Sequence, residues 1–378
     1  MLYADAKGLA AELKFRDPVQ ARALSLRLQQ LCDEIDRDPI SLMHVCGSHE
    51  QAIAKYGLRS ILPKKLDLIM GPGCPVCVTD LPEVDEAVVL AEDGVIIATY
   101  GDMVRVPGTA KSLAEAQAEG ARVEVVYSAS QAVELARATD TEVVFFATGF
   151  ETTAVTTAAI VLQGNLPKNF SILSAHKYVP PAMELVAQIP ETRVEGFLAA
   201  GHAATITGWG LFEDLVRRYE IPVVVAGFEP LDILAGLVRL TELIRDKDVS
   251  VVNMYPRCVT REGNRVAQAQ MWKVFRTAGG IWRGIADVPD GNLRLREEYA
   301  DVDARVKFKI DITRLREHVP SALTQQCICG AIMSGLASPN DCMLFSKECD
   351  PENPVGACMV SSEGTCKIWF QYGGHPDL

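Results

Sequence analysis

Short apolar segments alternate with helix-like segments along most of this chain, and this alternation restricts the fold more than any other feature. The apolar segments have the length of strands, and most of them end in a polar loop. They lie at 40–45, 66–71, 94–101, 122–128, 141–149, 170–177, 194–202 and 221–229. Strands that alternate with helices form parallel sheets that are covered by helices on both faces. The sequence therefore predicts an α/β fold.

The strand-like segments fall into two blocks, which predict two similar parallel-sheet α/β domains around a cleft. We place domain I at 41–130 and domain II at 131–235. Residues 1–40 carry leucine and alanine at helical spacing, and we expect these N-terminal helices to pack on the C-terminal domain. Residues 236–378 predict a helical and irregular C-terminal domain that contains a cysteine-rich tail.

The charge and hydropathy of the chain exclude several classes of partner. The formal net charge is −12, whereas binding to nucleic acid or to an anionic membrane needs clustered lysine and arginine. No apolar run approaches the roughly 20 residues of a membrane span, and the N-terminus lacks the pattern of a signal peptide. We expect a cytoplasmic protein, whose reducing environment favours metal ligation or redox chemistry over structural disulfides.

Two cysteine-containing loops follow apolar segments of the first block. In open parallel sheets, ligands bind at the carboxyl ends of the strands. The loop "CGSHE" presents Cys46 and His49, whose thiolate and imidazole suit a soft metal. The loop "GPGCPVC" presents Cys74 and Cys77, which can form a disulfide or share a metal. We expect Cys46, Cys74 and Cys77 to converge in the cleft.

Polar residues of the neighbouring loops are candidates for supporting roles. Asp102 and Arg105 in "YGDMVRVPG" can pair with each other or bind an anion. Glu151 in "GFETT" is a candidate functional carboxylate, because the cap of the following helix does not require it. His202 follows a very apolar strand, and we interpret it as a structural histidine.

The C-terminal tail holds six of the eleven cysteines. Zinc sites normally use two closely spaced pairs, and this tail has one. The usual ferredoxin spacings are absent. A four-thiolate iron–sulfur cluster accounts for four of the six, and the other two can form a redox-active pair beside it. The six are Cys327, Cys329, Cys342, Cys349, Cys358 and Cys366.

The chain resembles the HypD family of [NiFe]-hydrogenase maturation factors over essentially its whole length. The resemblance is carried by five motifs in this order: "CGSHE", "GPGCPVCVT", "TYGDMVRVPG", "GFETT" and the tail with "PENPVGACMVSSEGTC". One departure is Gln51, where relatives often carry a second histidine, and it weakens any claim that a histidine there is essential. The resemblance implies two related α/β domains and an iron–sulfur domain around a central cleft.

The resemblance also implies a cofactor, namely a [4Fe–4S] cluster in an arrangement similar to that of ferredoxin:thioredoxin reductase. It implies that Cys329 and Cys358 form a disulfide pair beside the cluster. The cluster ligands that it implies are Cys327, Cys342, Cys349 and Cys366.

The function that the resemblance implies is a scaffold, formed with the small protein HypC, on which an Fe(CN)2CO unit is built. HypE supplies the cyanide from a thiocyanate. We expect Cys46 to hold the transient iron with its CN and CO ligands, and Cys74 and Cys77 to assist in binding it or to change between dithiol and disulfide. His49 and Glu151 complete the set of catalytic candidates.

Release of cyanide from a thiocyanate takes two electrons, which a dithiol supplies. We therefore hypothesise an electron relay from the cluster through Cys329 and Cys358 to Cys74 and Cys77, with no conventional turnover of a free substrate. The residues leave two alternatives open. One is a cluster-dependent protein thiol–disulfide oxidoreductase, which has no need of Cys46. The other is a zinc-stabilised α/β binding protein without a redox role.

Overall fold

The computed structural model describes residues 15–316 and 322–374. The chain divides into two compact units, and each unit is built from segments that are far apart in the sequence. Within the described residues, unit 1 comprises 15–73, 186–264 and 368–374, and unit 2 comprises 74–185, 265–316 and 322–367. A search of the described residues for a helix with the length and hydropathy of a membrane crossing finds none.

Unit 1 is built on a parallel sheet with the strand order β2-β1-β7-β8-β9. Its strands are β1 (Ile40–His44), β2 (Leu66–Met70), β7 (Gly196–Ala200), β8 (Val223–Ala226) and β9 (Val251–Asn253). Its helices are α2 (Pro18–Asp33), α3 (Gly47–Lys55), η1 (Leu58–Ile61), α11 (Gly201–Thr207), η2 (Trp209–Phe212), α12 (Glu213–Tyr219) and α13 (Pro230–Asp246).

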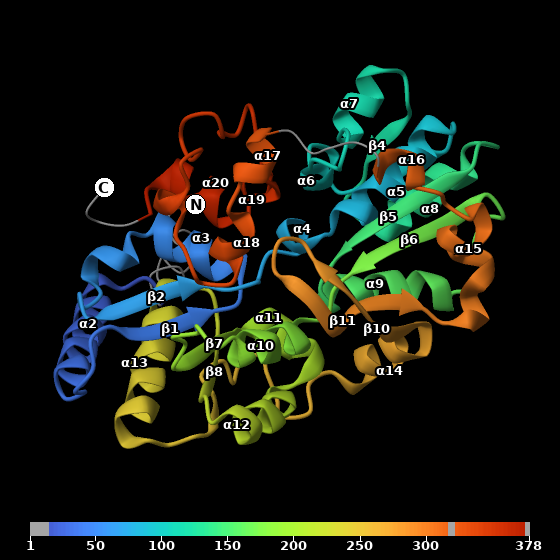
Figure 1. The fold of residues 1–378 in the computed structure, drawn as a ribbon. Helices are drawn as coiled ribbons and strands as arrows, with labels where there is room; N and C mark the ends of the chain where they lie inside the picture. The colour runs from blue at the N-terminus through green and yellow to red at the C-terminus, as the bar shows by residue number, and fades with distance from the viewer. Residues whose placement is uncertain (1–14, 317–321, 375–378) are drawn as a thin grey trace, which may run out of the picture. The chain divides into compact units, whose positions relative to one another are not determined.

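The core of unit 1 lies between this sheet and two helices. Every residue of β1 is buried, as expected for a strand that has neighbours on both edges. The helix α13 packs on β7 and β8, and α2 packs beside α13 (Figure 1). The helix α2 begins at Pro18, because the Asp17 carboxylate accepts hydrogen bonds from the backbone N–H groups of Val19 and Gln20.

Unit 2 is built on a second parallel sheet, with the order β4-β3-β5-β6, and an antiparallel hairpin. Its strands are β3 (Ile96–Thr99), β4 (Val123–Val125), β5 (Val143–Gly149), β6 (Phe170–His176), β10 (Phe275–Trp282) and β11 (Ala286–Leu295). Its helices up to residue 308 are α4 (Pro75–Val78), α5 (Leu81–Glu92), α6 (Gly101–Val104), α7 (Leu113–Ala118), α8 (Ala129–Arg137), α9 (Glu151–Leu162), α14 (Arg265–Val274), η3 (Glu297–Val302) and α15 (Ala304–Phe308).

The C-terminal part of unit 2 consists of short helices joined by loops. They are α16 (Thr313–Arg316), α17 (Ala322–Gln326), α18 (Cys329–Met333), η4 (Pro339–Asp341) and α19 (Ala357–Val360). Two further helices, α10 (Val179–Gln188) and α20 (Thr365–Tyr372), cross the division between the units.

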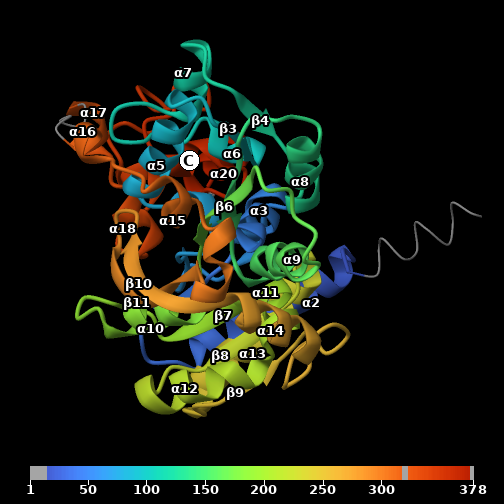
Figure 2. The ribbon, with the colours of Figure 1, turned by 90° about the vertical axis from the view of Figure 1, so that its right-hand side faces the viewer.

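The core of unit 2 surrounds the strands β5 and β6, which are buried along their whole length. The helices α8 and α9 pack on β5, and α14 packs on α9. The strand β11 runs beside β6, so that the long β10–β11 hairpin, orange in Figure 2, extends the core of this unit.

The two parallel sheets confirm the predicted α/β class, but the strands are not distributed between them as the sequence predicted. The segment 41–130 supplies β1 and β2 to one sheet and β3 and β4 to the other, and 131–235 is divided in the same way. The tail segment 322–367 belongs to the unit that contains the second sheet. The reason is that strand-forming segments of one chain carry no local signal for the sheet that they join.

Part of the N-terminal segment packs on a helix that lies mostly in the predicted C-terminal domain, 236–378. The helix α2 packs on α13 within unit 1. Residues 1–14 of the predicted N-terminal helices lie outside the described residues.

A buried ion pair joins three segments of unit 2. The Lys177 ammonium, just after β6, lies 2.7 Å from Glu83 Oε2 on α5 and donates to Asn292 Oδ1 on β11 at 2.8 Å. Arg294 Nη2 lies 3.1 Å from the other oxygen of Glu83. Burial by itself would raise the pKa of Glu83, but Lys177, Arg294 and Arg305 lower it to about 2. Glu83 is therefore ionised.

We expect Lys177→Met to destabilise the protein by about 3 kcal/mol, because it removes the cation closest to the buried Glu83 carboxylate. Chemical denaturation measures this change in the free energy of unfolding. Lys307→Met, which removes a partly exposed pair with Glu142, is the control and should cost less than about 1 kcal/mol. Equal losses in the two variants would contradict the structural role of Lys177.

Candidate functional site

Cys46 lies where three neighbouring strands of unit 1 end. It follows β1 and is the residue before α3, and its side chain is buried. His202 follows β7 and Phe228 follows β8, and β1, β7 and β8 are adjacent in the sheet. Because parallel strands end at the same edge of a sheet, these side chains meet there. The Cys46 Sγ atom lies 3.9 Å from His202 Nδ1.

The two histidines of this group are neutral. Burial lowers the pKa of His202, and burial together with the neighbouring His44 lowers the pKa of His49 to about 3. The rings of His49 and His202 lie on Phe228, with centroid distances of 4.8 and 5.1 Å. Neutral imidazoles and a thiol are ligands that suit a soft metal.

The hydrogen bond of His49 decides which of its nitrogens is free. His49 Nε2 lies 2.9 Å from the carbonyl oxygen of Gly227. A carbonyl only accepts, so Nε2 carries the proton and Nδ1 carries a lone pair. In the described part of the chain this buried Nδ1 has no hydrogen-bond partner. Buried polar atoms without a partner are rare, and such an atom is available to a ligand.

The glutamate of "CGSHE", Glu50, holds the loop in place. Both Glu50 oxygens accept hydrogen bonds from Arg59 at 2.8 Å, and the carboxylate also bonds His44 and Trp369 Nε1. The burial of Glu50 would raise its pKa, but Arg59 and His44 hold it below its usual range. Gln51 is exposed to solvent.

The predicted pair of "GPGCPVC" is a disulfide between Cys74 and Cys77, and both residues are buried. They belong to unit 2, whereas Cys46 belongs to unit 1. The chain passes from one unit to the other between Gly73 and Cys74. Within unit 1, Gly47 N–H donates to the carbonyl oxygen of Gly73 at 3.1 Å. The convergence of the three cysteines in one cleft stays a prediction.

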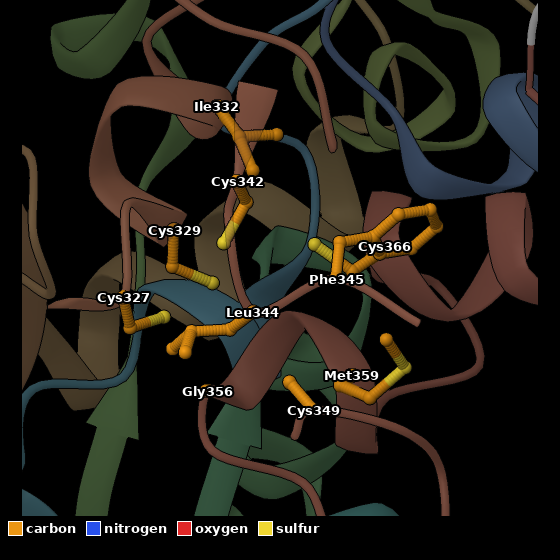
Figure 3. A pocket seen from close by; sticks show the side chains of 10 residues that line it. All are labelled: Cys327, Cys329, Ile332, Cys342, Leu344, Phe345, Cys349, Gly356, Met359 and Cys366. Carbon is orange, nitrogen blue, oxygen red and sulfur yellow. The ribbon is translucent and has the colours of Figure 1, made fainter. Parts of the chain in front are cut away.

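The cysteine-rich tail forms a pocket in unit 2 that is lined by five of its six cysteines. Figure 3 shows their side chains around it, together with apolar neighbours. Cys358 is fully buried. The five pocket cysteines are Cys327, Cys329, Cys342, Cys349 and Cys366.

Cys329 lies at the centre of a network of thiols. It interacts electrostatically with the thiols of Cys327, Cys358 and Cys366. This interaction with Cys329, together with burial, raises the pKa of Cys327 and of Cys358. The interaction with Cys329 and Cys358 lowers the pKa of Cys366 to about 6. In the structure Cys329 and Cys358 are both free cysteines, so their disulfide stays a prediction.

Backbone features of the pocket suit a group that sulfur atoms hold. The Val355 N–H donates to the Cys349 sulfur at 3.4 Å, and such bonds tune iron–sulfur centres. A Cβ atom at Gly356 would lie 2.7 Å from the Cys327 sulfur and 3.3 Å from the Cys329 sulfur. Only glycine leaves this space open.

The arrangement is not that of a site for a single metal ion. Across the described residues, no group of three or more His, Cys, Asp or Glu side chains is placed to hold one ion. A cluster of four thiolate ligands has different requirements, because each cysteine binds a different iron atom. The pocket cysteines, the open space at Gly356 and the bond to Cys349 fit such a cluster.

Asp102 and Arg105 of "YGDMVRVPG" each bind the tail. Among the described residues there is no ion pair between the two, which the sequence analysis had given as one possibility. The Asp102 carboxylate accepts hydrogen bonds from Ser361 and Ser362. Arg105 donates to the carbonyl oxygens of Pro351 and Glu352. The two side chains therefore fix the loops between Cys349 and Cys366.

Glu151 is the first residue of α9, and it is almost completely buried. Its Oε1 atom accepts a hydrogen bond from the Val179 N–H at 2.9 Å, and its Oε2 atom has no hydrogen-bond partner among the described residues. Burial raises the pKa of Glu151 to about 7. A carboxyl group of this kind can take up or release a proton near neutral pH.

From the sequence, His202 was interpreted as a structural histidine, but in the structure it lies beside Cys46. The only signal available was its position after a strand, in the same place that Cys46 occupies after its own strand. The adjacency of β1 and β7, which brings the two residues together, is a property of the sheet.

Comparison with known proteins gives a consistent family. The family model for HypD, described as the hydrogenase formation hypA family, matches residues 20–373. A putative hydrogenase expression/formation protein of Methanocaldococcus jannaschii is 44% identical over 349 residues, which cover 92% of this chain and 95% of that protein. The hydrogenase maturation factor HypD of Azotobacter vinelandii is 41% identical and covers 95% of this chain and 96% of its own length. The hydrogenase maturation factor HypD of Cupriavidus necator is 40% identical, and the alignment covers 89% of this chain and 91% of that protein.

The raised pKa of Glu151 predicts a pH-dependent contribution to stability. The folded chain binds the proton more tightly than the unfolded chain, whose carboxyl has its ordinary pKa of 4.5. This contribution is full below about pH 4.5 and is lost as the pH rises through about 7. At about 1.4 kcal/mol per pKa unit, the loss is up to roughly 3 kcal/mol.

Glu151→Gln should therefore unfold at a higher temperature than the wild type at pH 8, with little difference at pH 5. Thermal unfolding at both values measures this effect. Glu124→Gln, at an exposed position, is the control. It should leave the unfolding temperature unchanged at pH 5 and at pH 8. If the unfolding temperatures of Glu151→Gln and the wild type differ by the same amount at pH 5 and at pH 8, the Glu151 carboxyl does not titrate between these pH values.

Proposed function

Because the chain belongs to the HypD family of hydrogenase maturation factors, we propose that it is a redox-active scaffold on which the Fe(CN)2CO unit of [NiFe]-hydrogenase is assembled. The scaffold works in the cytoplasm together with HypC, and HypE supplies the cyanide. The observation that carries this proposal is the group around Cys46, in which a buried thiol and two neutral imidazoles lie at one edge of a parallel sheet.

Cys46 is the proposed anchor for the iron that is being modified. The position before a helix favours the thiolate form of a cysteine. His202 Nδ1, 3.9 Å from the Cys46 sulfur, is placed to accept the thiol proton. His49 Nδ1 offers a second uncharged nitrogen. A thiolate is a suitable ligand for a low-spin iron with cyanide and CO.

Cys74 and Cys77 are the proposed source of the two electrons that free cyanide from a thiocyanate. The dithiol gives two electrons and becomes the disulfide seen in the structure. The sulfur–carbon bond of the thiocyanate breaks, cyanide leaves as an anion, and the partner sulfur becomes a thiol. Of the two protons released by the dithiol, one goes to that thiol. Glu151, with its raised pKa, is a candidate acceptor for the other.

The thiols of the tail are the proposed reductant of this disulfide. The helix α19, which carries Cys358, packs against α4, which carries Cys77. Oxidation of Cys329 and Cys358 to a disulfide would return Cys74 and Cys77 to the dithiol, because the exchange transfers two electrons and two protons. A [4Fe–4S] cluster held by Cys327, Cys342, Cys349 and Cys366 supplies electrons one at a time when it is bound.

Burial of the disulfide weighs against the alternative of a general protein thiol–disulfide oxidoreductase. Attack by a thiol of another protein requires access to one of the two sulfurs. Cys74 and Cys77 are 0% and 2% exposed. The buried group around Cys46 also has no role in that alternative.

Replacement of Cys46 tests the anchor. The protein is produced together with HypC and purified without oxygen, and its infrared spectrum is recorded. We expect bands of metal-bound cyanide and CO in the wild type, and their loss in Cys46→Ala, because the iron loses its thiolate. Cys258→Ala, which removes an exposed cysteine, is the control and should keep the bands. Bands that persist in Cys46→Ala would refute the anchor, and a wild type without bands would favour the oxidoreductase.

Replacement of Gly356 tests the pocket of the tail. In Gly356→Ala the new Cβ atom would lie within 3.3 Å of two cysteine sulfurs. We therefore expect the protein to retain iron and sulfide about tenfold more weakly, which is a typical effect of replacing a residue that supports metal ligands. Chemical analysis of iron and acid-labile sulfide measures this loss. Gly279→Ala, whose Cβ would meet only Asp287 at 3.9 Å, is the control. Unchanged iron and sulfide in Gly356→Ala would place the cluster elsewhere.

A further inference from the structure

The segment that follows β9 in unit 1 reaches the same edge of the sheet as Cys46. The Met254 N–H donates to the carbonyl oxygen of Val225 at 2.9 Å, which continues the parallel pairing of β9 with β8. The next residue is Tyr255, and its N–H donates to Asn253 Oδ1 at 2.9 Å. These two bonds fix the backbone that carries the Tyr255 side chain.

Two glycines leave the space that the Tyr255 ring occupies. A Cβ atom at Gly201 would lie 2.7 Å from the Cδ1 atom of the ring, and one at Gly227 would lie 2.6 Å from its Cε2 atom. Both distances are well below the roughly 3.5 Å at which carbon atoms make contact. Gly201 follows β7 and Gly227 follows β8, which are adjacent strands. The ring therefore packs against the ends of two neighbouring strands.

These two glycines are directly linked to the side chains around Cys46. Gly201 precedes His202, whose Nδ1 atom lies 3.9 Å from the Cys46 sulfur. The carbonyl oxygen of Gly227 accepts the hydrogen bond from His49 Nε2, which leaves the lone pair on His49 Nδ1. The positions of the two glycines thus determine where both imidazoles lie relative to the Cys46 sulfur.

The Tyr255 ring is itself held on two further sides. The central carbon of the Arg257 guanidinium lies over the ring, 4.3 Å from its centroid. Arg257 donates two hydrogen bonds to the buried carboxylate of Asp232, which fix the guanidinium. Phe228 meets the Tyr255 ring edge to face at a centroid distance of 6.4 Å. Because both imidazoles lie on Phe228, Tyr255 supports that ring as well.

We propose that Tyr255 is a positioning residue for the iron site at Cys46, and that its ring, packed against Gly201 and Gly227, holds the two imidazoles in place. The proposal deepens the proposed function and rests on it, because Cys46 is the suggested anchor of the iron. The contacts are made by the ring and not by the hydroxyl group. A phenylalanine should therefore serve in place of this tyrosine, and an aliphatic side chain should not.

The first measurement uses the protein without the iron unit. The full-length chain is produced without HypC, with isotope-labelled histidine, and NMR spectra give the chemical shifts of the ring nitrogens. His49→Gln identifies the signals of His49. We expect a protonated Nε2 and an unprotonated Nδ1 for His49 in the wild type. In Tyr255→Leu we expect shifts averaged between two tautomers, because the carbonyl group of Gly227 is no longer held against Nε2.

Matched variants separate the effect of the ring from effects on the fold. Tyr255→Phe keeps the ring and should give the His49 signals of the wild type. Tyr127→Leu removes a tyrosine that is 85% exposed and should also leave these signals unchanged. Circular dichroism reports the fold of each variant. If Tyr255→Leu is unfolded, Tyr255→Met, which fills more of the space, takes its place.

The second measurement is the infrared spectrum of each variant after production with HypC. We expect the bands of metal-bound cyanide and CO to be about tenfold weaker per chain in Tyr255→Leu, as is typical when a residue that supports metal ligands is replaced. The bands that remain should be shifted in wavenumber, because the surroundings of the iron differ. A loss of stability alone would weaken the bands without shifting them. Tyr255→Phe should keep both their intensity and their position.

His49 signals or infrared bands in Tyr255→Leu that equal those of the wild type would overturn the role of Tyr255 and leave the proposed function intact. Equal changes in Tyr255→Phe and Tyr255→Leu would also overturn it, because the hydroxyl group and not the ring would then explain them. A wild type without cyanide and CO bands would overturn the proposed function and, with it, this inference.

Discussion

The buried ion pair of Lys177 and Glu83 is the interaction on which the arrangement of unit 2 depends. Glu83 lies on the helix that follows the Cys74–Cys77 disulfide, and Lys177 lies at the end of β6. Asn292 and Arg294 bring the β10–β11 hairpin to the same place. An uncompensated charge at this position would cost several kcal/mol, so the helix, the strand and the hairpin have to remain together. The hairpin turn in turn reaches the cysteine-rich tail through Gly284.

The two units offer different chemistry at the same structural position, the carboxyl edge of a parallel sheet. In unit 1 this edge presents a thiol and two neutral imidazoles, which are uncharged donors for a soft metal. In unit 2 it presents Lys177 and the buried carboxyl of Glu151, close in the chain to the ends of β6 and β5. The sulfurs of unit 2 come from short helices outside the sheet and from the loops between them. The proposed site for the iron that is being modified and the proposed thiol redox chemistry thus belong to separate units.

The sequence predicted the strands and the reactive residues better than it predicted their partners. The apolar segments form the strands of the two parallel sheets, and Cys74 and Cys77 are bonded. Asp102 and Arg105, in contrast, each bind the tail, more than 240 positions away along the chain. His202 lies beside Cys46 although nothing local distinguishes it from a core histidine. Such pairings depend on which strands and loops become neighbours, and a single sequence contains no direct record of that.

The sequence by itself determined the α/β class, the positions of the loops that end the strands, and the residues able to bind metal or exchange electrons. These properties follow from local patterns: the length and hydropathy of a segment, the spacing of cysteines and the residues of a turn. Only the tertiary structure decided that each half of the chain contributes strands to both sheets, that His202 meets Cys46, and that Asp102 and Arg105 bind the tail. The physical reason is that burial and the contacts of distant segments determine the energies of these arrangements. Those contacts exist only when the chain is folded.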